Sequence, residues 1–214
     1  MADSGTRSVK IGADERTGWS SDRPRPGAEN RPPRPPDIST RNRVLKPSDR
    51  MRYSPGSLVI VVAGAIGDRD PFVRRVFEDQ NAVFSHAKIR HMLAGRVPEA
   101  EIEAKTDELL EATVAKRLAN GSTVVVPVDD LDRETREHYA RMAHAHRRPR
   151  HLVFVESSRE AVAEDDRAAV NELRRALEAG ELGEEGFQTS LRVGGAAISE
   201  LKRIVFRPPP RDDD

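Results

Sequence analysis

The pattern of hydrophobic and polar positions predicts alternating strands and helices from about residue 55 onward. Residues 58–62 form an entirely apolar run, and residues 122–126 form a second run that is apolar from Val124 onward. Such runs are expected of strands in a parallel sheet that is covered on both faces. A third apolar run, at residues 151–155, follows Pro149. Between these runs, apolar residues recur every three or four positions, which is typical of amphipathic helices. The alternation predicts an α/β fold with a central parallel sheet in three layers.

The remaining elements are predicted from local signals. Helices are expected at residues 71–79, 86–93, 102–118, 131–146 and 165–179, and further strands at 82–85 and 202–206. The third helix is expected to stop at Asn120-Gly121 and the last at Gly180, because glycine readily adopts the left-handed conformation that ends helices. Either Asp130 or Asp132 is expected to cap the fourth helix.

The N-terminal part of the chain has a different composition. Residues 1–54 are rich in Arg, Pro, Ser and Asp, with RPRPG at 23–27 and RPPRPP at 31–36. They contain few apolar residues and are predicted to be a disordered basic tail. Such a tail is a solvated tether, a ligand for an aromatic-lined groove, or an electrostatic arm for nucleic acid. The folded domain would cover residues 55–207, followed by a second disordered tail at 208–214.

Charge and composition narrow the classes of function. Residues 1–52 hold 12 Lys and Arg against 7 Asp and Glu, and the remainder holds 24 against 29. The acidic body argues against a broad nucleic-acid face, so a protein or nucleic-acid partner is expected to bind through residues 23–52. The absence of cysteine excludes disulfides and thiolate metal sites. No apolar run reaches the length of a membrane span, and a cytoplasmic protein without membrane contact is expected.

The segment at residues 57–72, SLVIVVAGAIGDRDPF, has the strand, glycine turn and helix of a phosphate-binding loop. The motif GxxxxGK[S/T] needs a second glycine, a lysine and a hydroxyl to hold phosphate and magnesium. Counted from Gly64, these positions are Arg69, Asp70 and Pro71, with Gly67 inside the loop. A carboxylate in place of the lysine repels phosphate. The alternative is a turn without a ligand, with Asp70 as N-cap and Pro71 as first helical residue.

Several stretches in this order resemble one family. Residues 83–90 read VFSHAKIR, matching a VxSxxxIR pattern, and a long helix ending in Asn-Gly, an apolar strand and residues 127–131, PVDDL, follow. Over residues 57–206 the chain resembles the P-loop kinases of the polynucleotide-kinase and zeta-toxin type, AAA-like ATP-binding proteins. The resemblance implies a P-loop NTPase-like fold with ATP, magnesium and a catalytic aspartate. Ala87 stands at the position of that aspartate, so no catalytic residue is expected.

The resemblance also implies the positions of a vestigial site. The expected nucleotide-site residues are Gly64, Gly67, Arg69, Asp70, Asp129 and Asp130, and the expected substrate-site residues are Ser85, Arg90 and Arg167. The lysine, the hydroxyl and the base of the kinase pattern are all replaced, and phosphoryl transfer depends on such positioning and charge-neutralising groups. The arginines after Glu156 equally fit a solvated helix face.

Four histidines, which are possible metal ligands, lie close together in sequence. They are His138, His144, His146 and His151. Helical ligands need a spacing of four, and His144 and His146 are two residues apart, so no metal is expected. The sequence predicts surface histidines near a helix C-terminus.

Three functional hypotheses follow. The first is a catalytically degenerate P-loop kinase-like domain without a cofactor, acting as a regulatory or interaction module. The second is a divergent active kinase acting on a nucleic-acid end or a small hydroxyl compound. It would use ATP and Mg, with Arg69 or a later arginine replacing the lysine and Asp129 or Asp130 holding magnesium. The third is a scaffold that acts through its Pro/Arg-rich tail.

Overall fold

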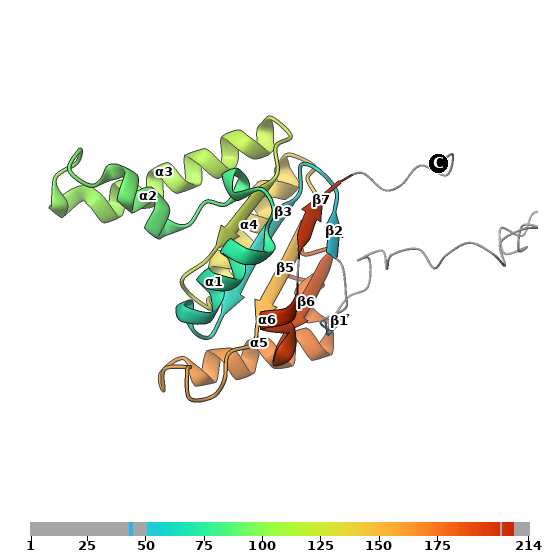
Figure 1. Ribbon diagram of the computed structural model, residues 1–214. Helices are drawn as coiled ribbons and strands as arrows, with labels where there is room; N and C mark the ends of the chain where they lie inside the picture. The colour runs from blue at the N-terminus through green and yellow to red at the C-terminus, as the bar shows by residue number, and fades with distance from the viewer. Residues whose placement is uncertain (1–42, 45–50, 202, 208–214) are drawn as a thin grey trace, which may run out of the picture. The chain divides into compact units, whose positions relative to one another are not determined.

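Two parallel sheets organise the protein. The structure is a computed structural model that describes residues 43–44, 51–201 and 203–207. The larger sheet has the order β1-β6-β5-β3-β4 and the smaller pairs β2 with β7 (Figure 1). The larger sheet contains β1 (Arg43–Val44), β6 (Thr189–Val193), β5 (Arg150–Val155), β3 (Leu58–Ala63) and β4 (Val124–Pro127); the smaller contains β2 (Met51–Tyr53) and β7 (Ile204–Phe206). All pairs are parallel, which confirms the predicted α/β fold with a parallel sheet.

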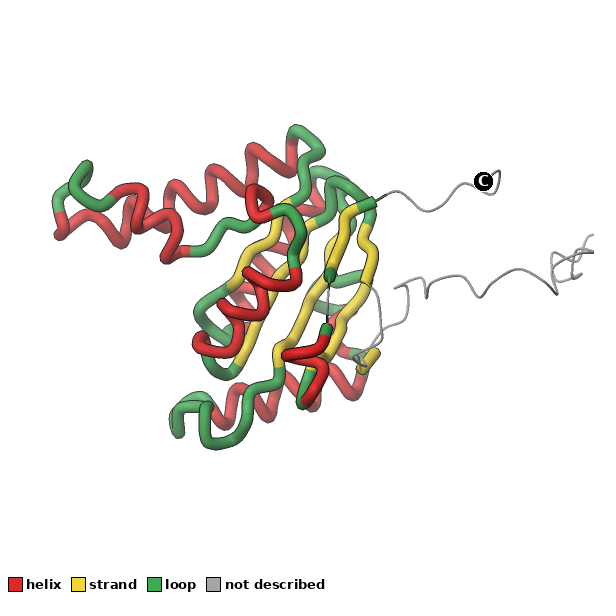
Figure 2. The backbone as a smooth tube through the Cα atoms, in the orientation of Figure 1, coloured by secondary structure: helices red, strands yellow, loops and turns green. Residues whose placement is uncertain are grey.

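Helices connect the strands, as the hydrophobic pattern predicted (Figure 2). They are α1 (Ile66–Val76), α2 (His86–Leu93), α3 (Glu99–Ala119), α4 (Arg133–Ala145), α5 (Arg167–Ala179) and α6 (Ala196–Glu200), with 3-10 turns η3 (Gln80–Ala82) and η4 (Glu181–Gly183). Gly180 ends α5 in the left-handed conformation, as predicted. Among the described residues, no helix is both long enough and apolar enough to cross a bilayer.

The central strand β3 is buried on both faces, and this explains its continuous apolar sequence. Leu58, Ile60 and Val62 pack with buried residues of α3, α4 and α5. Val59 and Val61 point to the opposite face and pack with α1, α6 and the β2–β7 pair. Alternate residues of a strand face opposite sides of a sheet, so the two hydrophobic clusters form separate layers.

Helix α1 begins earlier than the sequence predicted. It starts at Ile66 and not at Pro71, and Ala65, not Asp70, is the N-cap residue. The buried face of α1 includes Arg69 together with Phe72, so residues before the proline belong to the same helical stripe. Pro71 is exposed. Proline has no backbone N–H, so it cannot donate the helical hydrogen bond to the carbonyl of residue 67. The prediction that Asp70 and Pro71 begin the helix is therefore wrong.

The strand predicted at residues 82–85 is not a strand. Val83 forms a single parallel bridge with Val125, and the Phe84 amide donates to the Val125 carbonyl at 2.9 Å. On either side, Asp79 caps η3 and Ser85 caps α2. The two capped turns leave too few residues between them for a longer ladder.

The boundary of the folded part differs from the prediction. Met51 and Tyr53, assigned to the tail, are buried in β2, which pairs with β7 and not with the central sheet. Strand β6 was not predicted, because its sequence TSLRV is not a continuous apolar run. The Pro/Arg-rich stretches at 23–27 and 31–36, Lys202 and the tail at 208–214 lie outside the described residues.

His151 is buried in the core, not on the surface as predicted. Its ring stacks on Tyr53 at 4.2 Å between centroids. Nδ1 lies 2.8 Å from Thr189 Oγ1, and Nε2 lies 3.3 Å from Ser57 Oγ. The Ser57 hydroxyl already donates to the Ser54 carbonyl, so it accepts from Nε2–H and leaves Nδ1 to accept from Thr189. Burial, with a smaller contribution from the Arg150 charge, lowers the pKa of His151 to about 3.

This low pKa predicts a loss of stability in mild acid. The unfolded chain binds a proton near the ordinary pKa of about 6.5, so the full contribution is present above that pH and is lost as the pH falls toward 3. We expect the protein to be about 2 kcal/mol less stable at about pH 5 than at about pH 7.5 from this group alone. Urea unfolding at both pH values measures this difference in the free energy of unfolding. The variant His151→Gln should reduce the difference. An unchanged difference in the variant would contradict the assignment.

Candidate functional site

The turn that should hold phosphate is too short to surround a ligand. Strand β3 ends at Ala63 and α1 begins at Ile66, so only Gly64 and Ala65 connect them. A Cβ atom at Gly64 would lie 2.8 Å from Val162 Cγ2 and 2.9 Å from Val170 Cγ2. Glycine is therefore required at residue 64 by close packing of protein side chains. A Cβ atom at Gly67 would meet no atom within 4 Å, so packing does not require glycine there.

Arg69 is the centre of a buried polar cluster at the end of β4. Its side chain is 2% exposed. The guanidinium pairs with Asp70 Oδ1 at 2.8 Å and Asp129 Oδ1 at 2.6 Å, and it donates to the carbonyl of Val128. These contacts join α1 to the segment that follows β4. The structure thus brings together three of the predicted nucleotide-site residues, Arg69, Asp70 and Asp129, in pairs with one another.

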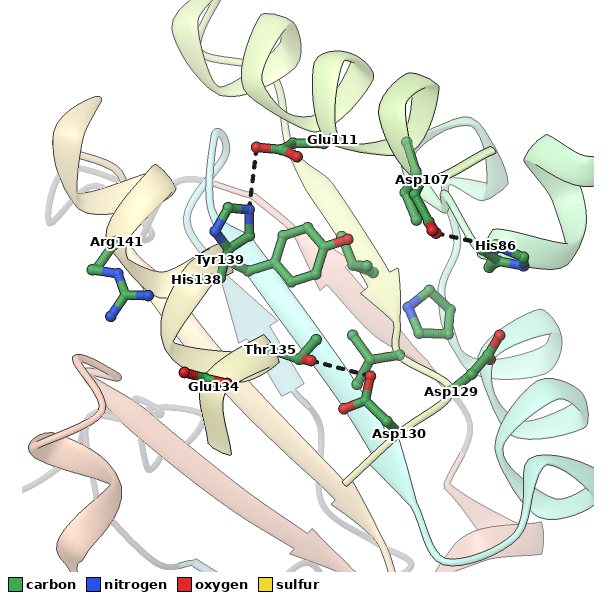
Figure 3. Close-up of a pocket in the computed structure, with 14 residues that line it drawn as sticks. His86, Asp107, Glu111, Asp129, Asp130, Glu134, Thr135, His138, Tyr139 and Arg141 are labelled. Atoms are coloured by element: carbon green, nitrogen blue, oxygen red, sulfur yellow. Dashed lines mark hydrogen bonds and ion pairs between the residues drawn. The ribbon is translucent and has the colours of Figure 1, made fainter. Parts of the chain in front are cut away.

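Asp130 has a separate role at the start of α4. Its Oδ1 accepts from the Asp132 amide at 2.9 Å, and its Oδ2 accepts from Thr135 Oγ1 at 3.2 Å (Figure 3). Asp132 occupies the N-cap position but makes no capping bond with its side chain. The Asp130 side chain therefore fixes the first turn of α4 and lies apart from the Arg69 pairs.

The predicted substrate-site residues are dispersed over three structural contexts. Ser85 is the N-cap of α2 and accepts from the Lys88 amide at 3.2 Å. Arg90 pairs with Glu103 at 2.6 Å and with Glu99, which joins α2 to α3. Arg167 begins α5, beyond β5 in the chain. Ser85 and Arg90 thus have structural contacts of their own.

A pocket opens between α2, α3 and α4 beside the end of β4 (Figure 3). It has a volume of about 520 Å³. Its lining consists of His86, Asp107, Leu110, Glu111, Val126, Pro127, Val128, Asp129, Asp130, Glu134, Thr135, His138, Tyr139 and Arg141. Leu110, Val126 and Val128 supply a buried apolar floor. The pocket combines a hydrocarbon floor with a wall rich in carboxylates.

Imidazoles and carboxylates face each other across this pocket. His86 Nε2 lies 3.4 Å from Asp107 Oδ1 and 3.3 Å from Glu103 Oε2. His138 Nε2 lies 3.3 Å from Glu111 Oε1, linking α4 to α3. The sequence predicts a surface position for His138, and its side chain is 46% exposed. No group of three or more potential metal-binding side chains occurs in the described part of the chain.

Tyr139 is the most buried polar side chain of the pocket. It is 9% exposed, and Figure 3 shows its hydroxyl pointing from α4 into the space between the helices. Within the described residues, no hydrogen bond is made by this hydroxyl. Burial, followed by the negative charges of Glu111 and Asp107, raises the pKa of the Tyr139 hydroxyl to about 12. The group stays protonated at neutral pH and can both donate and accept a hydrogen bond.

Comparison with known proteins adds no family. Neither the models of protein families nor the curated proteins give a match to this chain.

Sequence reasoning missed the pocket residues on α2, α3 and α4. Asp107 and Glu111 are four residues apart on α3, and Thr135 and Tyr139 are four apart on α4. This spacing places each pair on one side of its helix and was visible in the sequence. Which sides of the two helices face each other depends on tertiary packing, so the pocket itself could not be located.

Proposed function

We propose that the chain is a P-loop kinase-like domain that no longer transfers phosphate and acts as a regulatory or interaction module. The pairing of the buried Arg69 with Asp129 carries this proposal. Phosphoryl transfer needs a P-loop cation on the phosphates and a carboxylate available to magnesium. Here the carboxylate after β4 is paired with an arginine of the chain itself.

The arrangement of the sheet supports the same conclusion. The chain passes from β3 to β4 on one side and then to β5 on the other, which makes the ends of β3 and β5 a topological switch point. Open α/β sheets generally bind ligands there, beyond the carboxyl ends of the strands. In this protein Val162 and Val170 pack directly on Gly64 at that place. The residues present do not fit a bound nucleoside triphosphate with magnesium.

A divergent active kinase is less compatible with these contacts. Arg69 would have to bind phosphate in place of the missing lysine. Its side chain is 2% exposed, and the guanidinium already contacts Asp70, Asp129 and the Val128 carbonyl. Freeing it would break charge-assisted hydrogen bonds, each worth about 1.5 to 3 kcal/mol.

We propose that a partner protein would bind the module at the projecting helix pair α2 and α3. The large exposed hydrophobic residues in the described part are Ile66, Met92 and Leu109. Met92 belongs to α2 and Leu109 to α3, the helix pair that projects away from the sheet in Figure 1. A partner protein that covered these two side chains would remove their apolar surface from water.

A thermal-shift titration of the full chain with ATP, GTP and magnesium tests the loss of nucleotide binding. A ligand at 100 times its dissociation constant stabilises a protein by about 2.7 kcal/mol, which amounts to several degrees in Tm. We expect no magnesium-dependent shift with either nucleotide, while an active P-loop kinase used as positive control shifts. A saturable shift, or hydrolysis of the γ-phosphate that Asp129→Asn abolishes, would overturn the proposal.

A further inference from the structure

We propose that the pocket between α3 and α4 binds a small organic polycation, a compound with two or three ammonium groups joined by short alkyl chains. The proposal does not depend on the state of the nucleotide site. It depends on three features of the pocket: its charge, its floor and the hydroxyl group of Tyr139.

The charge of the pocket is strongly negative. Its lining contains Asp107, Glu111, Asp129, Asp130 and Glu134. The compensating guanidinium groups are those of Arg69, on Asp129, and Arg141, which contacts Glu137 outside the lining. Three negative charges remain when both imidazoles are counted as neutral. An anionic ligand such as a phosphate ester would be repelled, whereas a cation with several charges matches the site.

The floor and shape distinguish an organic cation from a bare metal ion. Leu110, Val126 and Val128, each at most 6% exposed, form hydrocarbon surface beneath the carboxylates. Methylene groups of an alkyl chain gain free energy by covering such surface, and a hydrated metal ion does not. The volume of about 520 Å³ matches the size of ordinary small-molecule pockets.

Tyr139 supplies a polar group that the protein leaves without a partner. Its side chain is nine-tenths buried and directed into the pocket (Figure 3). The described residues provide no hydrogen bond to its hydroxyl. The hydroxyl oxygen at the end of this ring remains open to the pocket, and an ammonium group placed between Tyr139 and Asp107 or Glu111 would donate a hydrogen bond to it. The hydroxyl thus marks where one end of the ligand lies.

Isothermal titration calorimetry of the full chain with spermidine tests the proposal. At low salt we expect saturable binding with a dissociation constant of about 0.1 to 1 mM, from several partly exposed ion pairs. Magnesium chloride at equal ionic strength should not reproduce it, although added salt should weaken it. Spermidine binding that magnesium displaces completely at equal ionic strength would overturn the organic-cation assignment.

Substitutions of pocket residues test whether spermidine binds at this site. Asp107→Asn with Glu111→Gln should weaken spermidine binding about tenfold, and Tyr139→Phe, which keeps the buried ring, should weaken it about three- to tenfold. Glu172→Gln removes one charge from an exposed position of α5 and should change binding less than about twofold. Circular dichroism and Tm identify any variant that fails to fold. No saturable binding by the wild-type chain at about 10 mM spermidine, or equal weakening by Glu172→Gln, would overturn the proposal.

Discussion

Glu185→Ala should lower the free energy of unfolding by about 3 to 5 kcal/mol, the largest effect we expect from one substitution. Glu185 and Arg136 are each 4% exposed and form two parallel bonds, at 2.8 and 2.7 Å. Arg136 also donates to the Leu131 carbonyl. Removal of the carboxylate leaves a buried guanidinium charge without its counterion. Thermal unfolding should show Tm about 10 °C lower.

A matched control and a double variant separate the buried pair from the surrounding loop. Glu184→Ala, at the exposed neighbouring position, should change stability by less than about 0.5 kcal/mol. Arg136→Met combined with Glu185→Leu should recover most of the loss, because no charge is then buried without a partner. If Glu185→Ala cost less than about 1 kcal/mol, the pair would not be buried as described. The pair holds α4, and with it Tyr139, against the segment before β6.

Arg69→Met should destabilise the protein by about 2 to 3 kcal/mol and leave its response to nucleotides unchanged. The methionine keeps most of the buried stem but removes the bonds to Asp129, Asp70 and the Val128 carbonyl. The two carboxylates are 42% and 34% exposed, so water can partly replace the lost partner. The expected loss of stability in Arg69→Met is therefore smaller than the loss from breaking a fully buried ion pair.

Arg74→Met is the control for Arg69→Met, because Arg74 is an exposed arginine of the same helix. It should change the free energy of unfolding by less than about 0.5 kcal/mol. Urea unfolding measures both variants, and a thermal-shift titration with ATP and magnesium measures nucleotide binding. A stable Arg69→Met protein together with nucleotide binding present only in the wild type would support the divergent kinase.

The sequence predicted the elements whose signal is local. The run at 58–62 needed no knowledge of its neighbours, because a strand covered on both faces is apolar at every position. Gly180 marked the end of α5 through its backbone freedom alone. Strand β6 was missed because Thr189 and Arg192 are satisfied by partners distant in sequence, His151 and Glu178. Such partners are not visible in a local window.

The residues of the candidate site show the same difference between local signals and long-range packing. The proximity of Arg69 and Asp129 was implied by the order of the elements, because both follow strands that are neighbours in a parallel sheet. The direction of the arginine was not predicted, since helix α1 begins at Ile66 and turns Arg69 toward the core. Tyr139 was missed because its burial depends on the packing of α4 against α3.

The pairing of β2 with β7 also has a consequence for the order in which the protein folds. Met51 pairs with Ile204, so strands near opposite ends of the described chain complete the same hydrophobic layer. Contacts between residues so distant in sequence are slow to form, because a long loop must close first. During synthesis, Met51 cannot pair with Ile204 until β7 has left the ribosome. The apolar side chains of β2 are therefore exposed to chaperones for longer than those of β3.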